Sequence, residues 1–383
     1  MTDFTCDLPA QVFLSGPGVV SELAPRMDAF GLKRALVVCS NSVRRSALLA
    51  KVLEVLGQRC AGRFEEVVQH SAVTLVDQAA GRARELEIDS LVAVGGGSSS
   101  DTAKAVAILL AEGGPLESHA SKFVYPDQFF PKPLFQPKLP IFSIPTTASA
   151  AEVTPGLGIR SPAGHKYLFW DTKLASRAIF LDEQANLEVP AQVMATTGMN
   201  GFAHCAEGLY SRLRNPVSSG LALQGARMFA ESLPAMVAEP ENPQHRGQVL
   251  AAAALSGMVI SNARVGIHHA VCHCLGARGG LPHGVANSIM LPHALAYNRD
   301  VAGAELRQLA EALGVRPQPE EAIAAVVRLQ EDAKVPRRLR DAGLDRALLP
   351  AIAEDTLHDR GLYFNPKRTT SAEPILAMLE AAW

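Results

Sequence analysis

Five of the eleven histidines in this chain lie in one short stretch of its second half. His269 and His273 are four residues apart, which places them on one face of a helix, and His283 follows a Gly-Gly pair that would end that helix. Upstream, Asn200 and His204 form a second pair with the same spacing. Imidazoles grouped on short helices bind a divalent metal or polarise a substrate oxygen. Taken singly, each could instead be a core histidine or a helix cap.

Length and charge restrict the classes of protein to consider. A chain of 383 residues is long enough for two domains with large cores. Its formal net charge of −2 gives no basic excess for nucleic acid or an anionic membrane, so we expect neither partner. We recognise no signal peptide and no uninterrupted apolar run of spanning length. The six cysteines contain no CxxC pair, which favours buried thiols in a reducing, cytoplasmic setting.

The elements that must position these residues change character along the chain. In the first half, short apolar runs such as residues 34–40 and 90–94 alternate with amphipathic helical stretches. This alternation predicts a parallel sheet wound by helices, a Rossmann-like α/β domain. In the second half the pattern is helical almost throughout. We therefore predict an α/β domain over residues 1–187 and an all-helical catalytic domain over residues 188–383.

A glycine turn follows the run at 90–94. Gly95, Gly96, Gly97 and Ser98 lead into a helical stretch, where Asp101 could cap the helix. Glycines allow the backbone to approach a pyrophosphate closely, and a helix N-terminus stabilises its charge. The turn is neither GxGxxG nor a P-loop, which disfavours ATP hydrolysis. A plain tight turn is the alternative interpretation.

Other candidate cofactor contacts come later in the α/β half. Thr146, Thr147 and Ser149 follow a predicted strand and could donate to ribose and phosphate oxygens, or could only cap the next turn. Lys166 is a cation among apolar neighbours. Residues 113–140 form a long connection, which we interpret as a surface flap or an edge hairpin.

In combination, these motifs resemble the iron-containing (group III) alcohol dehydrogenases over nearly the whole chain. The resemblance implies a dinucleotide-binding α/β domain, an all-helical C-terminal domain, an active site between them, NADH or NADPH as cofactor, and a homodimer or larger assembly. The residues that carry it are Gly95–Ser98 with Asp101 and Lys104, Pro145–Ala148 with Glu152–Thr154, Gly198-Met199 with His204 and Glu207, the histidine stretch 266–293, and Asn365-Pro366.

The resemblance also implies roles for the histidines. In that family one Asp and three His hold a divalent metal, Fe²⁺ or Zn²⁺, and the three histidines match His204, His269 and His283. A fourth, which aids proton transfer, matches His273. The position of the Asp is occupied by Asn200, and a neutral amide is a poorer ligand than a carboxylate. The expected metal set is therefore Asn200 with three histidines, and the expected catalytic residues are all four histidines.

The same Asn occurs in one branch of the family, the maleylacetate reductases. Members of this branch are taken to work without a metal and to reduce maleylacetate, an unsaturated oxo-dicarboxylate from aromatic-compound catabolism, to 3-oxoadipate. The matching motifs are Gly198–Asn200 with Ala203-His204, His268-His269 with Cys272-His273, and Leu291–Asn298. Residues 282–287, in contrast, are more similar to the metal-dependent dehydrogenases. A metal-dependent alcohol dehydrogenase or aldehyde reductase therefore remains the alternative.

Two further departures concern the cofactor half. NAD-preferring members carry an acidic residue at the end of the strand where this chain has Ser40, and Arg44 and Arg45 lie close by. The missing negative charge predicts use of NADPH, or of both cofactors. Residues 148–151, Ala-Ser-Ala-Ala, stand where many members have glycines.

The predicted chemistry is hydride transfer between a nicotinamide and a small carbonyl, alcohol or oxo-acid substrate. An anionic substrate would require a cation, and Arg264, Arg278 and Arg160 are candidates. Two other classes remain open: a lyase of the dehydroquinate synthase type on the same scaffold, and a nucleotide-binding protein without activity. The four matching histidine positions disfavour the second.

Overall fold

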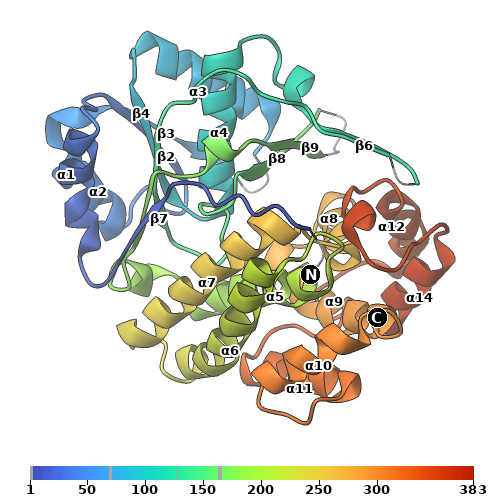
Figure 1. Ribbon diagram of the computed structural model, residues 1–383. Helices are drawn as coiled ribbons and strands as arrows, with labels where there is room; N and C mark the ends of the chain where they lie inside the picture. Colours follow the sequence, from blue (N-terminus) through green and yellow to red (C-terminus); the bar gives the residue numbers. More distant parts are fainter. Residues whose placement is uncertain (1–2, 69–70, 127, 163–165) are drawn as a thin grey trace. The chain divides into compact units, whose positions relative to one another are not determined.

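The chain forms two compact units in a computed structural model (Figure 1). The structure describes residues 3–68, 71–126, 128–162 and 166–383. One unit comprises Pro9–Lys122 and Pro131–Val189, and the other is built mainly from Pro190–Trp383. The segment ending at Leu8 and the segment Phe123–Phe130 also belong to the second unit, whereas the sequence places them in the α/β domain.

These two segments attach to the helical unit through hydrogen bonds that sequence patterns do not reveal. The Asp7 N–H donates to Asn262 Oδ1 at 2.8 Å. The Tyr125 hydroxyl donates to the Thr370 carbonyl at 2.5 Å. Both bonds join residues far apart in the chain, and so the composition of the segments alone cannot assign them to a unit.

A six-stranded parallel sheet forms the centre of the first unit, in the order β1-β10-β7-β4-β2-β3. Its central strands read as continuous apolar runs because helices cover both of its faces. The strands are β1 (Val12–Ser15), β2 (Ala35–Ser40), β3 (Cys60–Val67), β4 (Ser90–Gly95), β7 (Ile141–Pro145) and β10 (Ala178–Leu181).

Alternate residues of each strand pack against different helices. Leu36 and Val38 share a core with α3 and α4, while Val37 between them faces the core formed with α1 and α2. The helices are α1 (Leu23–Ala29), α2 (Ala47–Leu56), α3 (Val73–Glu85) and α4 (Gly97–Glu112), with 3-10 turns at Val19–Glu22, Gly57–Arg59, Leu116–His119, Thr172–Leu174 and Ala185–Glu188. The predicted α/β fold with a parallel sheet is confirmed.

Two small antiparallel pairs accompany the main sheet. Strands β8 (Gly156–Arg160) and β9 (Lys166–Trp170) pair with each other, as do β5 (Lys122–Val124) and β6 (Gln128–Phe130) within the long connection. The first pair follows the loop after β7, so it extends the part of the unit that carries Thr146 and Thr147.

The second unit is helical, as predicted. Figure 1 shows its helices from green to red along the chain. A buried cluster of aliphatic side chains from α8, α9, α12 and α14 forms one core. The helices are α5 (Ala191–Tyr210), α6 (Pro216–Ala238), α7 (Pro243–Ala263), α8 (Ile267–Ala277), α9 (His283–Asn298), α10 (Gly303–Ala312), α11 (Pro319–Asp332), α12 (Leu349–Thr356), α13 (Gly361–Phe364) and α14 (Glu373–Ala381), with a 3-10 turn at Arg346–Leu348.

Glycines allow the helices of this unit to approach closely. A Cβ on Gly208 of α5 would lie 2.1 Å from a methyl carbon of Val259 on α7. A Cβ on Gly284 of α9 would lie 2.9 Å from the Thr196 backbone of α5. This second contact brings His283, the first residue of α9, against the helix that carries Asn200.

No single helix in the described part of the chain is long and apolar enough to cross a membrane. Helices α7 and α8 reach the length and apolar composition of a span only when taken together, and the chain bends by 107° between them.

Candidate active site

Helix α5 presents polar side chains along one buried face. Asn200, His204 and Glu207 follow one another at spacings of four and three residues, which align on one side of a helix. All three are buried, with relative exposures of 3%, 4% and 0%. Polar groups are buried at a cost unless they find partners, so their surroundings identify what this face holds.

Imidazoles from α8 and α9 complete the cluster. The rings of His204 and His269 stack with centroids 4.9 Å apart, and His283 lies 5.6 Å from His269. The His273 ring stacks on His283 at 5.6 Å. Asn200 Oδ1 lies 3.1 Å from His269 Nε2. The structure therefore brings together all five residues that the sequence assigned to the metal and catalytic set.

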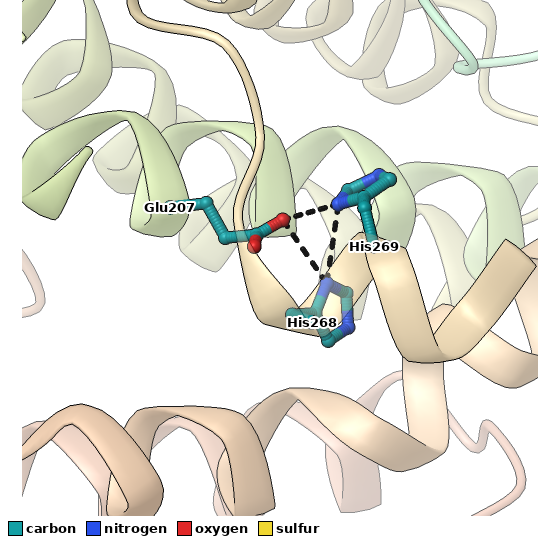
Figure 2. A group of neighbouring side chains, drawn as sticks. All are labelled: Glu207, His268 and His269. Atoms are coloured by element: carbon teal, nitrogen blue, oxygen red, sulfur yellow. Dashed lines mark hydrogen bonds and ion pairs between the residues drawn. The ribbon is translucent and has the colours of Figure 1, made fainter. Parts of the chain in front are cut away.

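A second layer lies behind His269 (Figure 2). The Glu207 carboxylate accepts hydrogen bonds from His269 Nδ1, from His268 Nδ1 at 3.3 Å and from the Gly266 N–H at 2.8 Å. Burial alone would raise the pKa of Glu207, but the two imidazoles outweigh it and hold the pKa below its usual range. Glu207 is therefore a buried carboxylate anion that fixes the orientation of two rings.

His268 is arranged as the counter-ion of Glu207. Its Nε2 lies 3.1 Å from the Asn287 carbonyl, while its Nδ1 faces the carboxylate. A ring with an acceptor at each nitrogen is satisfied only when both nitrogens carry protons. Burial lowers the pKa of His268, but the interactions with Cys272 and Glu207 raise it by a larger amount. The pKa therefore lies well above its ordinary value.

His269 and His204 are neutral rings. Burial lowers the pKa of His269 to about 4 and the pKa of His204 well below its ordinary value. Because His269 donates through Nδ1 to Glu207, its Nε2 presents a lone pair toward Asn200 Oδ1. Two facing acceptors are stabilised by a shared cation, or by an Asn200 amide rotated so that its N–H points at the ring.

His273 differs from these rings because it is partly exposed, at 19% of its side chain, and has its own carboxylate. Its Nδ1 donates to Asp359 Oδ2 at 2.8 Å, and Asp359 Oδ1 accepts from the Gly361 N–H. Burial would raise the pKa of Asp359, but the interaction with His273 outweighs it and lowers the pKa. Within the described residues, the Nε2 atoms of His273 and His204 make no hydrogen bond, and both remain available to a ligand.

Two sets of residues in this region could hold a metal ion. The ligand atoms of Glu207, His268 and His269 lie within 4.8 Å of one another, although these atoms already hydrogen-bond together. The other set is the predicted one, in which Asn200 joins three imidazoles. Three imidazoles suit zinc or iron, and a carboxylate behind a ligating histidine is the usual outer layer of such sites. The predicted set therefore fits a divalent ion, with one negative charge fewer than a set that contains Asp.

The α/β unit has a matching cradle for a nucleotide. Strand β4 lies between β2 and β7, at the point where the strand order reverses direction, and ligands of such sheets bind there beyond the strand ends. Gly95 has φ +138°, and a Cβ on Gly96 would lie 3.1 Å from the Thr147 side chain. The positive φ of Gly95 favours glycine just before α4. The turn and the free N–H groups of the helix fit a pyrophosphate.

The other residues of the cofactor prediction lie around this turn. A Cβ on Gly97 would contact Ser149, and the Thr146 N–H donates to the Gly95 carbonyl at 3.0 Å. Ser98 is in the first turn of α4. Lys166, on β9, packs against Gly158 beside Asp101.

Ser40 ends β2, the strand next to β4, and its hydroxyl bonds to Ser42 at 2.8 Å. Arg44 does not lie free beside it. Its guanidinium pairs with Glu65 on β3 at 3.1 Å. An acidic side chain thus stands near the end of β2 although it comes from the neighbouring strand, which sequence position could not indicate.

The expectation that Asp101 caps α4 is wrong. The helix begins at Gly97 with Gly96 as its N-cap, so Asp101 lies within the helix. Its carboxylate accepts from the Gly158 N–H at 3.2 Å, on β8. Gly158, in the β8–β9 pair, thus binds the carboxylate that the sequence predicted at the N-terminus of the helix.

Lys104, which the sequence offered only as part of a motif, joins α4 to the loop after β7. Its ammonium is fully buried and donates to the carbonyls of Ala151, Thr154 (2.6 Å) and Gly156 (3.1 Å). Burial lowers the pKa of Lys104 to about 8, an effect that Asp101 and Glu152 oppose. This one cation holds the hydroxyl-bearing loop against the glycine turn.

The predicted substrate arginines have different surroundings. Arg278 forms a bidentate pair with Asp355 at 2.6 and 3.0 Å, and 43% of its side chain is exposed. Arg160 is exposed on β8 in the α/β unit. Arg264 is the C-cap residue of α7 and is partly buried near Arg360.

Sequence reasoning gave no role to Glu207, His268 or Asp359. The spacing of Glu207 from His204 on one helix face, and the adjacency of His268 and His269, are signals that could have found the first two. Asp359 carries no local signal, because its partner His273 is far away in the chain.

Comparisons with known proteins agree with this geometry. Residues 10–183 match the iron-containing alcohol dehydrogenase family, and residues 194–383 match the C-terminal part of the Fe-containing alcohol dehydrogenase family. A maleylacetate reductase of Burkholderia cepacia is 32% identical over 380 residues, which cover 99% of this chain and 97% of that protein. This chain therefore belongs to the iron-containing alcohol dehydrogenase family and is an oxidoreductase of that family.

Solved structures agree with this assignment and include both kinds of relative. The crystal structure of 1,3-propanediol oxidoreductase superposes with a TM-score of 0.91 at 30% identity, covering 100% of both chains. Maleylacetate reductase from Agrobacterium tumefaciens superposes with a TM-score of 0.84 at 27% identity, covering 100% of this chain and 99% of that chain.

Proposed function

We propose that this protein is an NAD(P)H-dependent reductase of an unsaturated oxo-dicarboxylate of the maleylacetate type. The observation that carries the proposal is the site itself, in which Asn200 occupies the fourth position beside His204, His269 and His283. The maleylacetate reductases among its relatives support the same substrate class.

The nicotinamide cofactor supplies a hydride. Hydride addition to the alkene carbon β to the substrate ketone leaves an enolate, and a proton on the α carbon then completes the reduction. The residues of this chain must therefore stabilise negative charge on the ketone oxygen and deliver one proton.

His273 is the residue best arranged to deliver the proton. Asp359 accepts a hydrogen bond from its Nδ1, so its Nε2 faces away from the carboxylate and is the ring atom that would pass a proton to the substrate. His204 and His269 are neutral and act by position. The imidazolium of His268, behind them, contributes positive charge without contacting the substrate.

If a divalent ion binds, Asn200, His204, His269 and His283 would hold it, and it would polarise the substrate oxygen as a Lewis acid. The metal-dependent alcohol dehydrogenase or aldehyde reductase is therefore the second candidate function. Stacking of His283 within the cluster favours it, because that ring completes a three-imidazole set.

One experiment separates the two candidates. We would measure iron and zinc in the gently purified protein and follow NADH and NADPH oxidation with maleylacetate before and after chelation. The proposal predicts turnover that chelation leaves unchanged. Stoichiometric metal with chelator-sensitive reduction of simple aldehydes, and no turnover of maleylacetate, would contradict it.

The Asn200→Asp variant sharpens this test. A carboxylate restores the missing negative charge, so the variant should bind Zn²⁺ more tightly than the wild type, by about tenfold or more. Calorimetric titration with Zn²⁺ measures this directly, with Asn186→Asp as the matched control at a buried amide of the other unit.

A further inference from the structure

Asn365 follows α13 and is buried, with 2% of its surface exposed. Each hydrogen-bonding position of its amide is occupied. The oxygen accepts from the Ile267 N–H at 3.2 Å and from Asn298 Nδ2 at 3.0 Å, and the nitrogen donates to Asn298 Oδ1 and the Lys367 carbonyl, both at 2.9 Å. Because an amide has two donors and two acceptor positions, these four bonds allow one orientation of the side chain.

Two of the four bonds join Asn365 to the end of α9. Asn298 is the last residue of that helix and is fully buried. The two amides exchange a pair of hydrogen bonds, so a change at either position leaves buried polar atoms of the other unpaired. The amide pair therefore fixes the end of the helix that begins with His283.

A third bond reaches the beginning of α8. The first N–H groups of a helix have no partner within the helix, and here two side chains bind them. The Gly266 N–H donates to Glu207 Oε1 at 2.8 Å, and the Ile267 N–H donates to Asn365 Oδ1. A Cβ on Gly266 would lie 2.8 Å from Asn365 Oδ1 and 3.2 Å from Glu207 Oε1, so both side chains close on the same backbone.

The direction of the His269 ring depends on where α8 begins. His269 lies in the first turn of α8, and its Nδ1 donates to the same Glu207 that binds Gly266. Its Nε2 then faces Asn200 Oδ1 at 3.1 Å. One carboxylate lets the start of the helix pivot, whereas a second fixed point removes that freedom. Asn365 supplies the second point without contacting the ring.

The segment that carries Asn365 also holds His273. Asp359, earlier in this segment, accepts from His273 Nδ1 at 2.8 Å. A Cβ on Gly361 would lie 2.6 Å from the Gly266 carbonyl oxygen, so the two backbones are in direct contact. Residues 359–365 therefore contact α8 at a ring, at its backbone and at its first turn. A displacement of Asn365 would move both rings of α8.

We infer that Asn365 and Asn298 are positioning residues for the reduction. Their amide pair sets the start of α8 against the end of α9, and with it the placement of His269 and His273 relative to His283. The inference rests on the proposed function for its rate measurement, whereas the placement of the His269 ring can be followed without turnover. Misplacement of reacting groups by about 1 Å can cost on the order of 100-fold in rate, even when the altered residue is remote.

Asn215 offers a matched control of the same residue type in the same unit. Its side chain is buried and caps α6, where its Oδ1 accepts from the Val217 and Ser218 N–H groups at 3.1 and 3.0 Å. Helix α6 carries none of the clustered histidines. Asn215→Ala therefore removes buried hydrogen bonds of a helix start and tests the effect of lost stability alone.

The first test compares kcat and KM with melting curves in Asn365→Ala, Asn298→Ala, the double variant and Asn215→Ala. Asn365→Ala should lower kcat for maleylacetate by on the order of 10- to 100-fold. It should leave the KM for NADPH unchanged, because the nucleotide cradle lies in the other unit. Asn298→Ala should lose less, since the bond to Ile267 remains, and the double variant should resemble Asn365→Ala because the two amides act as one unit. Asn215→Ala should keep the wild-type kcat.

The second test uses proton NMR of the protein without substrate. The proton between His269 Nδ1 and Glu207 lies in a charge-assisted hydrogen bond and should give a downfield resonance. This resonance should shift or broaden in Asn365→Ala and Asn298→Ala and stay in place in Asn215→Ala. Asn298→Ala keeps the test valid if Asn365→Ala does not fold.

Two results would overturn the inference: an unchanged resonance in the folded variants of the amide pair, or equal losses of kcat in Asn365→Ala and Asn215→Ala. If the wild type does not reduce maleylacetate but the resonance moves only in variants of the pair, the positioning role stands and the proposed reaction fails.

Discussion

Two buried ionic networks, one in each unit, make opposite use of their polar groups. In the α/β unit, all three N–H donors of Lys104 find backbone carbonyls, with Asp101 and Glu152 nearby. In the helical unit, Glu207 contacts His269 and Asp359 contacts His273 through one ring nitrogen, Nδ1. The first network leaves its cation no donor for a ligand, whereas the second leaves ring edges available.

The difference teaches how to interpret a buried charge. Both networks are costly to bury and both carry shifted pKa values, so neither burial nor pKa separates structure from catalysis. What separates them is whether the donors and acceptors are used up within the protein. The Lys104 network should therefore control stability and cofactor affinity, while His273 should control turnover.

The largest expected effect is on turnover. In His273→Asn the proton donor is lost, and kcat should fall by about 100- to 10,000-fold because general acid catalysis contributes that much. Thermal unfolding should change little, since His273 is partly exposed. The measurement is kcat for maleylacetate reduction beside a melting curve. His245→Asn, at a partly exposed ring paired with Glu239, is the control. If His273→Asn kept the wild-type kcat, the network in the helical unit would not control turnover as proposed.

Lys104→Met should act on stability and on the cofactor. It leaves three carbonyls without a donor and removes the cation shared by Asp101 and Glu152, which should lower the free energy of unfolding by about 3 kcal/mol. The loop that carries Thr147 and Ser149 should loosen, so the KM for NADPH should rise more than kcat falls. Denaturant unfolding and steady-state kinetics measure both, with exposed Lys51→Met as the control. A selective loss of kcat would contradict this assignment.

Glu152 should give the α/β unit a particular pH dependence. Burial raises its pKa to about 7, whereas an unfolded glutamate ionises at about pH 4.3. Between these values the unfolded chain binds fewer protons than the folded one, so the free energy of unfolding should fall as pH rises, by on the order of 2 kcal/mol.

Glu152→Gln tests this dependence by urea unfolding between pH 5 and 7. Over this pH range, the free energy of unfolding of the variant should depend less on pH than that of the wild type. Identical slopes in both proteins would show that Glu152 does not titrate as its burial requires.

The smallest expected effect concerns the backbone of the same loop. Ala150 has φ +61°, in the segment where many family members have glycine. Ala150→Gly relieves about 1 kcal/mol of strain but increases the entropy of the unfolded chain, so stability should change by less than about 1 kcal/mol. Ala148→Gly, where φ is not positive, should be destabilising. Equal destabilisation of both variants in melting curves would argue against strain at Ala150.

Much of the fold follows from patterns that a sequence displays directly. Apolar runs such as 34–40 and 90–94 alternate with helical stretches, and this alternation specifies a parallel sheet. The histidine positions were also predictable, since spacings of four residues survive in helices α5 and α8. These features depend on neighbours in the chain, where periodicity is informative.

The tertiary structure alone decided which groups complete the networks. Asp359 meets His273, Arg360 meets the segment of Arg264, and Lys104 meets the carbonyls after β7 across long stretches of chain. Glu65 reaches Arg44 from a neighbouring strand, and Asp101 bonds to β8 instead of capping its helix. Such pairings arise when helices and strands pack, because a buried polar group must find a partner wherever the fold supplies one. Local sequence determined the elements and the positions of the histidines, and packing determined the charge and orientation of each side chain in the site.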